Sequence, residues 1–177
     1  MQLKSPSAVS VFERGWLSSN NILLHGDDGA TLIDSSHCLH AEQTIALLRN
    51  ALRPGETLTT LVNTHLHPDA LSYRATGQRI ERFAHDALLR PGESLAVGKR
   101  SWQALAAPGH DPHSLILFDA QDGVLISADA LWENGFGVVF PELDGEQAFD
   151  DVAAVLDVVG RLAPRLVIPG HGAPFAD

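Results

Sequence analysis

Four histidines and two aspartates, most of them placed directly after short apolar segments, have the residue types of a metal site. They are His65, His67, Asp69, His110, Asp129 and His171. Imidazole and carboxylate groups are common ligands of zinc and of non-haem iron. A hydroxide bound to such an ion attacks esters, thioesters, lactones and amides at neutral pH. These residues therefore predict metal-assisted hydrolysis of a carbonyl compound.

The densest part of the pattern runs from His65 to Asp69. His65 and His67 are two residues apart, so at the end of a strand both rings face the same side. Taken alone, such a pair is read equally well as two polar residues in a loop. Asp69 shares their parity and adds a carboxylate, which favours the metal interpretation.

Three further junctions repeat one design, in which an apolar strand ends in a ligand-type residue. Pro-Gly turns precede His110 and His171, and Asp129 closes the apolar run before it. Two of them have simpler interpretations when taken alone. His110 is then a water-exposed turn histidine, and Asp129 is a helix cap before Ala130. Together they indicate a shared site, because distant strand ends can meet at one edge of a fold.

The elements that must position these residues form a repeated order of strands, helix and strand. The predicted strands are 8–12, 21–25, 30–33, 59–63, 102–106, 115–118, 124–127 and 165–168. Gly26-Asp27-Asp28-Gly29 is typical of a hairpin turn between the second and third. Two similar halves predict an α/β fold in which two sheets pack face to face with helices outside.

Two amphipathic segments are the predicted helices. Residues 40–52 place Ile45 and Leu48 on one face, with Ser35 or Ser36 as the cap. Residues 146–162 form the strongest helical pattern, with an apolar stripe that includes Phe149 and Val152. Residues 71–89 show little periodicity and carry no assignment.

Composition and charge narrow the functional class. The 177 residues carry a formal charge of −10, which disfavours a nucleic-acid partner. Cys38 is the only cysteine, so no intrachain disulfide is expected. No segment has the pattern of a signal peptide or a membrane span. We expect a single domain over residues 1–177, located in the cytoplasm.

At this point the sequence resembles the metallo-β-lactamase superfamily, whose signature is His-x-His-x-Asp-His followed by Gly-His, a later Asp and a final Gly-His. The matching segments are Asp34, residues 63–69, 108–110, 127–129 and 169–172. Within the superfamily it is most similar to glyoxalase II-like and lactonase-like metallo-hydrolases. The resemblance implies an αββα sandwich of two mixed sheets with outer helices and a site at one edge.

The resemblance also implies roles for individual residues. His65, His67 and His110 would form a first zinc site, Asp69 and His171 would serve a second, and Asp129 would bridge both. Asp69 would also act in catalysis, by orienting the attacking hydroxide or taking its proton.

The sequence departs from the family pattern after Asp69. The next position should be a histidine ligand, but it is Ala70, whose methyl group cannot bind a metal. We therefore expect a weakened second site. The first site keeps three imidazoles and a position for water. Two tightly bound zinc ions per chain would contradict this expectation.

The spacing of the motifs predicts missing segments. His110 lies only 43 positions after His67, and the chain ends six residues after His171. We expect that a segment has been lost next to Ala70, with Asp69 occupying its motif position by accident, and that a C-terminal helix has been lost as well.

Three functions remain open on the sequence. The leading one is a zinc-dependent hydrolase, with one or two zinc ions, acting on a small thioester, lactone or ester. In the second, His65, His110 and Asp129 hold a single Fe²⁺ in an enzyme similar to the persulfide-oxidising relatives. In the third, the chain is an impaired remnant that serves as a metal-binding or interaction module.

Some residues outside the central pattern also carry expectations. Loss of a covering helix would leave apolar sheet surface exposed, which predicts a homodimer. Asp34 is expected to support the histidine loop, and Trp132 and Phe136 are expected either to wall the substrate or simply to pack. His25 is expected at the surface, and residues 37–40 in a solvated loop.

Overall fold

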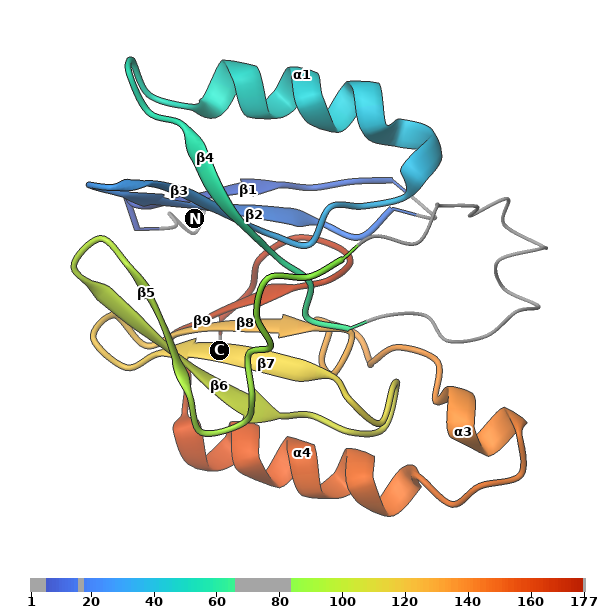
Figure 1. Cartoon of the computed structure of the whole chain (residues 1–177). Helices are drawn as coiled ribbons and strands as arrows, with labels where there is room; N and C mark the ends of the chain where they lie inside the picture. The colour runs from blue at the N-terminus through green and yellow to red at the C-terminus, as the bar shows by residue number, and fades with distance from the viewer. Residues whose placement is uncertain (1–5, 16–17, 66–83, 177) are drawn as a thin grey trace.

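Two β-sheets stacked face to face, with helices on their outer surfaces, form the architecture of the computed structural model (Figure 1). The structure describes residues 6–15, 18–65 and 84–176. Both sheets are mixed, since each joins antiparallel strands to one parallel pair. This confirms the αββα sandwich predicted from the sequence.

The first sheet has the strand order β1-β2-β3-β4. Its strands are β1 (Val9–Phe12), β2 (Asn21–Gly26), β3 (Gly29–Ile33) and β4 (Leu58–Val62). The predicted hairpin joins β2 to β3, and β4 returns parallel to β3 after a helical crossover. This crossover brings the end of β4, and hence His65, to the same side of the sheet as the end of β3.

The crossover contains a short 3₁₀ helix, η1 (Cys38–His40), followed by α1 (Ala41–Ala51). Neither Ser35 nor Ser36 caps this segment, because the His37 side chain accepts the Leu39 N–H instead. Ile45, expected on the buried face, is 47% exposed. Thr44 and Leu48 are the buried residues of α1.

The second sheet has the order β5-β6-β7-β8-β9. Its strands are β5 (Ser94–Val97), β6 (Arg100–Ala106), β7 (Leu115–Asp119), β8 (Val124–Ala128) and β9 (Leu166–Pro169). Strand β5 was not predicted, because only Val97 of its four residues is buried and it shows no strong apolar alternation. It is held by antiparallel pairing with β6.

Helix α4 (Phe149–Leu162) covers the outer face of the second sheet (Figure 1). It begins three residues later than predicted. Phe149 is 58% exposed and does not belong to the buried stripe. A short helix that the sequence did not indicate, α3 (Phe140–Leu143), precedes α4. The Glu142 carboxylate accepts the N–H groups of Ala148 and Phe149 and so fixes the start of α4.

The largest apolar cluster lies between the two sheets. Its buried members come from β1 to β3 on one side and from β5 to β9 on the other, among them Ile22, Ile33, Trp102, Leu117 and Ile168. Because this core locks the sheets together, the loops that follow β4, β6, β8 and β9 have fixed relative positions. Those loops carry His65, His110, Asp129 and His171.

Candidate metal centre

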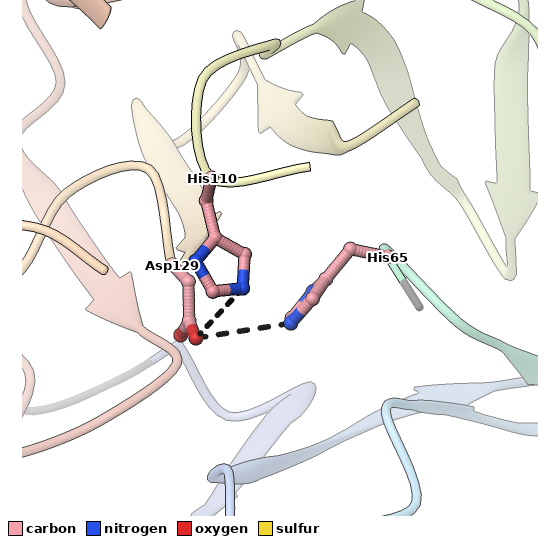
Figure 2. Close-up of side chains that lie close together, drawn as sticks. All are labelled: His65, His110 and Asp129. Carbon is pink, nitrogen blue, oxygen red and sulfur yellow. Dashed lines mark ion pairs between the residues drawn. The ribbon is translucent and has the colours of Figure 1, made fainter. Parts of the chain in front are cut away.

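The Asp129 carboxylate lies close to three imidazoles that come from different loops, two of which, those of His65 and His110, are drawn with it in Figure 2. Its Oδ2 is 3.7 Å from His65 Nε2, 3.6 Å from His110 Nε2 and 3.7 Å from His171 Nε2. Each histidine presents the same ring nitrogen to one oxygen. The structure therefore brings together four of the six residues singled out in the sequence.

The donor atoms have a spacing that suits a shared ion. Ligand atoms of His65, His110 and Asp129 all lie within 4.8 Å of one another. Two donors bound tetrahedrally to one zinc ion at about 2.0–2.1 Å are roughly 3.4 Å apart, close to the distances measured from Asp129. The two remaining predicted ligands, His67 and Asp69, lie outside the described residues.

A hydrogen-bond relay fixes which nitrogen His65 offers. Thr64 donates its N–H to Asp34 Oδ1 at 2.8 Å and its hydroxyl to Asp34 Oδ2 at 2.9 Å. The Thr64 hydroxyl is also 2.8 Å from His65 Nδ1. Since the hydroxyl proton points to Asp34, His65 Nδ1 must carry the proton between them, which leaves a lone pair on Nε2.

The support by Asp34 expected from the family resemblance is thus present, and it acts through Thr64. Asp34 is buried and has a φ of 57°, a left-handed conformation that turns the chain at the end of β3. Burial raises the pKa of the Asp34 carboxyl, while the nearby His65 and the two Thr64 donors act in the opposite direction. Thr64 itself was not singled out, because a threonine beside a histidine carries no distinctive sequence signal.

His110 is oriented by a backbone carbonyl. Its Nδ1 is 2.6 Å from the carbonyl oxygen of Val138, so Nδ1 carries the proton and Nε2 the lone pair. Burial lowers the pKa of the His110 imidazole, although the Asp129 carboxylate acts to raise it. The neutral ring is the form that a metal binds.

Asp129 is held by a strained turn and by an indole. Ala128, the last residue of β8, has a φ of 47°, which is uncommon for a residue with a side chain. The Trp132 Nε1–H donates to Asp129 Oδ1 at 3.3 Å. Oδ1 is thereby engaged, and Oδ2 faces the histidines. Trp132, expected either to wall the substrate or to pack, is placed beside the site.

Two glycines leave room for this carboxylate. A Cβ on Gly170, in the turn before His171, would collide with Asp129 Oδ1 and with the Ala128 carbonyl. A Cβ on Gly137 would lie 2.7 Å from His110 Nδ1 and 2.8 Å from Asp129 Cβ. The Pro-Gly-His pattern at residues 169–171 therefore reflects close packing against Asp129 as well as a turn.

His171 completes the group from the loop after β9. Its ring stacks edge-on against Trp132, with centroids 5.2 Å apart. The loop is held by Asn20, whose side-chain N–H groups donate to the carbonyls of Pro169 and Gly172. His171 is more exposed than His65 and His110, so it lies towards the open side of the group.

Two expectations about other histidines were wrong. His25 is buried, with Nδ1 at 2.8 Å from the Glu56 carboxylate and Nε2 at 3.0 Å from the Ser10 hydroxyl. His37 is also buried, whereas a solvated loop was expected. The sequence does not distinguish a buried histidine near the end of a strand or the start of a helix from an exposed one. The burial of His25 and His37 could therefore not be predicted.

A comparison with protein families places the chain in a known superfamily. The model described as the metallo-beta-lactamase superfamily matches residues 14–69 and 71–171. The match covers most of the chain and breaks at Ala70, where the sequence departs from the signature.

Two curated proteins illustrate the relatives. A hydroxyacylglutathione hydrolase of Bartonella quintana (strain Toulouse) is 31% identical over 115 residues, which are 58% of this chain and 46% of that protein. The acyl-coenzyme A thioesterase MBLAC2 of Gallus gallus is 24% identical over 134 residues, which are 75% of this chain and 48% of that protein. The chain therefore spans about half the length of these relatives.

Solved structures share the fold. A crystal structure of TTHA1623 in a di-iron-bound form has a TM-score of 0.72 and 22% identity, covering 95% of this chain and 94% of that one. At this identity the likeness shows the arrangement of the two sheets and outer helices. Among the described residues, no helix is both long and apolar enough to cross a bilayer.

Proposed function

We propose that this chain, which belongs to the metallo-β-lactamase superfamily, is a metal-dependent hydrolase of a small carbonyl substrate, with a thioester as the first candidate. The observation that carries the proposal is the Asp129 carboxylate within 3.7 Å of three histidine Nε2 atoms. A similarity to a hydroxyacylglutathione hydrolase and to an acyl-coenzyme A thioesterase favours thioesters over lactones and other esters.

His65, His110 and Asp129 would hold one metal ion, for which zinc is the first choice on the chemistry of the donor set. His171, which approaches the same Asp129 oxygen, would serve a second ion. A bound metal of this kind polarises a carbonyl group. It also lowers the pKa of a bound water, so that a hydroxide nucleophile is available near neutral pH. His67 and Asp69 belong to the same proposal through the family signature. Asp69 is proposed to orient the attacking water or to take its proton.

The chain's own contribution is to fix the tautomers of His65 and His110. The Asp34–Thr64 pair keeps the proton of His65 on Nδ1, and the Val138 carbonyl does the same for His110. Both rings therefore present a lone pair to the centre without rearrangement. Trp132 holds Asp129 Oδ1, so that Oδ2 keeps its direction when substrate binds.

Thioester hydrolysis in the presence of added zinc tests the proposal. The wild-type chain should release thiol from a hydroxyacylglutathione or from an acyl-coenzyme A, and the rate should fall at least a hundredfold after chelation. Asp129→Asn keeps the shape of the side chain but removes its charge, and should reduce the rate to a similar extent. Glu133→Gln, an exposed charge change close by in the sequence, is the matched control. Absence of hydrolysis of thioesters, esters and lactones at every metal level would favour the impaired-remnant alternative.

A second candidate is a mononuclear iron enzyme acting on persulfides. It is favoured by the triad of His65, His110 and Asp129, since two histidines and one carboxylate are the set used by many non-haem iron enzymes. Iron in the purified protein, together with oxygen uptake on addition of a persulfide, would support this function. Zinc in the purified protein, with no oxygen uptake on addition of a persulfide, would favour the hydrolase instead.

A further inference from the structure

A pocket of about 340 Å³ lies between the β1–β2 loop and the segment formed by η1 and α1. Its lining residues are Glu13, Arg14, Gly15, Ser18, His40, Gln43 and Leu47. None of them belongs to the proposed metal centre. The lining is largely polar, which suits a ligand with charged or hydrogen-bonding groups.

Arg14 is held in this wall by neutral partners. Its Nη1 donates to Asn21 Oδ1 at 2.6 Å and to Thr44 Oγ1 at 2.9 Å, and makes a longer contact of 3.4 Å with Ser36 Oγ. Its Nη2 donates to Gln43 Oε1 at 2.9 Å. The guanidinium therefore has a fixed position before any ligand arrives, so little side-chain entropy is lost on binding.

The described part of the chain offers no carboxylate partner for the charge of Arg14. Within residues 6–15, 18–65 and 84–176, no carboxylate forms an ion pair with it, whereas Arg90 and Arg100 are paired with acidic residues. Burial lowers the pKa of the Arg14 guanidinium. In a chain with a net charge of −10, a partly buried cation without a carboxylate is a favourable place for an external anion.

The geometry of the contacts leaves one edge of the guanidinium available. The four side-chain bonds use Nη1 and one position on Nη2. Among the described residues, Nε has no acceptor. Nε and Nη2 form the side-on edge with which arginine binds a carboxylate or phosphate through two parallel hydrogen bonds.

We propose that this pocket binds an oxyanion, a carboxylate or a phosphate group of a small molecule, with Arg14 as its principal ligand. The Ser18 hydroxyl and the His40 ring, which are 2.6 Å apart at Oγ and Nδ1, supply further polar groups in the same wall. Glu13 is the one acidic residue of the lining and opposes the binding.

The pocket is linked to the metal centre through Asn20. The backbone N–H of Arg14 donates to Asn20 Oδ1 at 3.0 Å. The Asn20 side-chain N–H groups bond to the carbonyls of Pro169 and Gly172, on either side of His171. One buried side chain thus connects the backbone of Arg14 to the loop that carries His171.

Nuclear magnetic resonance of the Arg14 side chain tests the oxyanion site. Titration of the zinc-loaded protein with inorganic phosphate should shift the Arg14 Nε–H signal to a plateau. Gln43→Glu places a carboxylate next to Nη2 and should weaken phosphate binding at least tenfold. Glu13→Gln removes the opposing charge and should strengthen it.

Gln103→Glu, the same substitution on an exposed position of β6, controls for the change in net charge and should bind phosphate as the wild type does. An unmoved Arg14 signal would overturn the proposal. So would equal affinities in the Gln43→Glu and Gln103→Glu proteins. Arg14 itself is left intact, because its bonds to Asn21 and Thr44 tie β2 to α1.

Enzyme kinetics distinguish an oxyanion that is part of the substrate from one that is a separate molecule. This experiment rests on the proposed function. If the anion is part of the substrate, phosphate inhibits competitively. Gln43→Glu then raises KM at least fivefold more for a carboxylate-bearing thioester than for a neutral one. If it is a separate molecule, phosphate binds without competing. If the protein hydrolyses none of the substrates, the proposed hydrolase function is refuted. The titration of the Arg14 signal then still tests whether the pocket binds an oxyanion.

Discussion

At the scale of single residues, the second nitrogen of each histidine decides what the first can do. His65 and His110 both turn Nε2 towards Asp129 because Nδ1 is engaged, by a threonine in one case and by a carbonyl in the other. The ligand types could be read from the sequence. The groups that fix their tautomers could not, since Thr64 and the Val138 backbone have no distinctive pattern.

Removal of the Thr64 hydroxyl should loosen His65. Thr64→Val keeps the shape of a buried side chain but breaks the bond to His65 Nδ1 and one bond to Asp34. We expect a 10- to 100-fold loss of metal affinity, as is usual when a ligand histidine loses its supporting partner. Competition with a chromophoric chelator measures it. Thr64→Ser restores the hydroxyl, and equal affinities for the two variants would contradict the relay.

Glu56 gives a pH-dependent prediction away from the metal centre. Burial acts to raise the pKa of Glu56, but the Arg53 N–H and the His25 ring outweigh it and hold the pKa below its ordinary value of 4.5. A lowered pKa means that the carboxylate stabilises the fold above pH 4.5 and that this contribution is lost as the pH falls through the folded-state value.

Urea unfolding of Glu56→Gln at several pH values checks this sign. The free energy of unfolding should be lower than that of the wild type at pH 7, and the difference should shrink below pH 4.5. Exposed Glu42→Gln is the control for the loss of one charge. A difference that grows towards acid pH would rule out the stabilising role of the carboxylate.

At the scale of elements, a strong apolar pattern was enough to predict a strand or a helix from the sequence, and a weak one was not. The buried runs of β7 and β8 and the stripe of α4 were visible because nearly every position obeys one pattern. Strand β5 depends on its pairing with β6, and α3 is a four-residue helix. Each has only four residues, too few to show a periodic pattern of its own.

The end of α4 contains a strained residue that can be improved. Ala163, at the C-cap, has a φ of 46°, a left-handed conformation that glycine adopts without steric cost. Ala163→Gly should therefore raise the free energy of unfolding by about 0.5–1 kcal/mol. The same change at the exposed mid-helix residue Ala154 should lower it by about 1 kcal/mol. Urea denaturation of both variants checks the opposite signs, and a destabilised Ala163→Gly would contradict the left-handed cap.

At the scale of the whole molecule, the family resemblance predicted the architecture correctly, because the motifs that carry it fall at the ends of strands. The loops after β4, β6, β8 and β9 converge only because two sheets pack on one core. The sequence predicted that convergence through the family signature. It could not give the distances around Asp129, which depend on Gly137, Gly170 and the turn at Ala128.

The homodimer expected from the sequence remains a prediction, and β4 is where we place it. In the described part of the chain β4 is an edge strand, and it contains neither a charged residue nor a proline. Its Leu58 and Leu61 are 40% and 53% exposed. Such an edge favours pairing with a second chain. Light scattering should show a dimer for the wild type and a monomer for Leu61→Lys, and a monomeric wild type would contradict the expectation.

The metal content of the purified protein, measured beside that of Asp129→Ala, tests the proposed centre most directly. The geometry around Asp129 predicts at least one zinc or iron ion per chain in the wild type. The alanine variant, once circular dichroism has shown that it is folded, should contain a small fraction of that amount. A wild-type protein that binds neither metal, or a variant that binds as much as the wild type, would contradict the proposal that the residues around Asp129 form a catalytic metal centre.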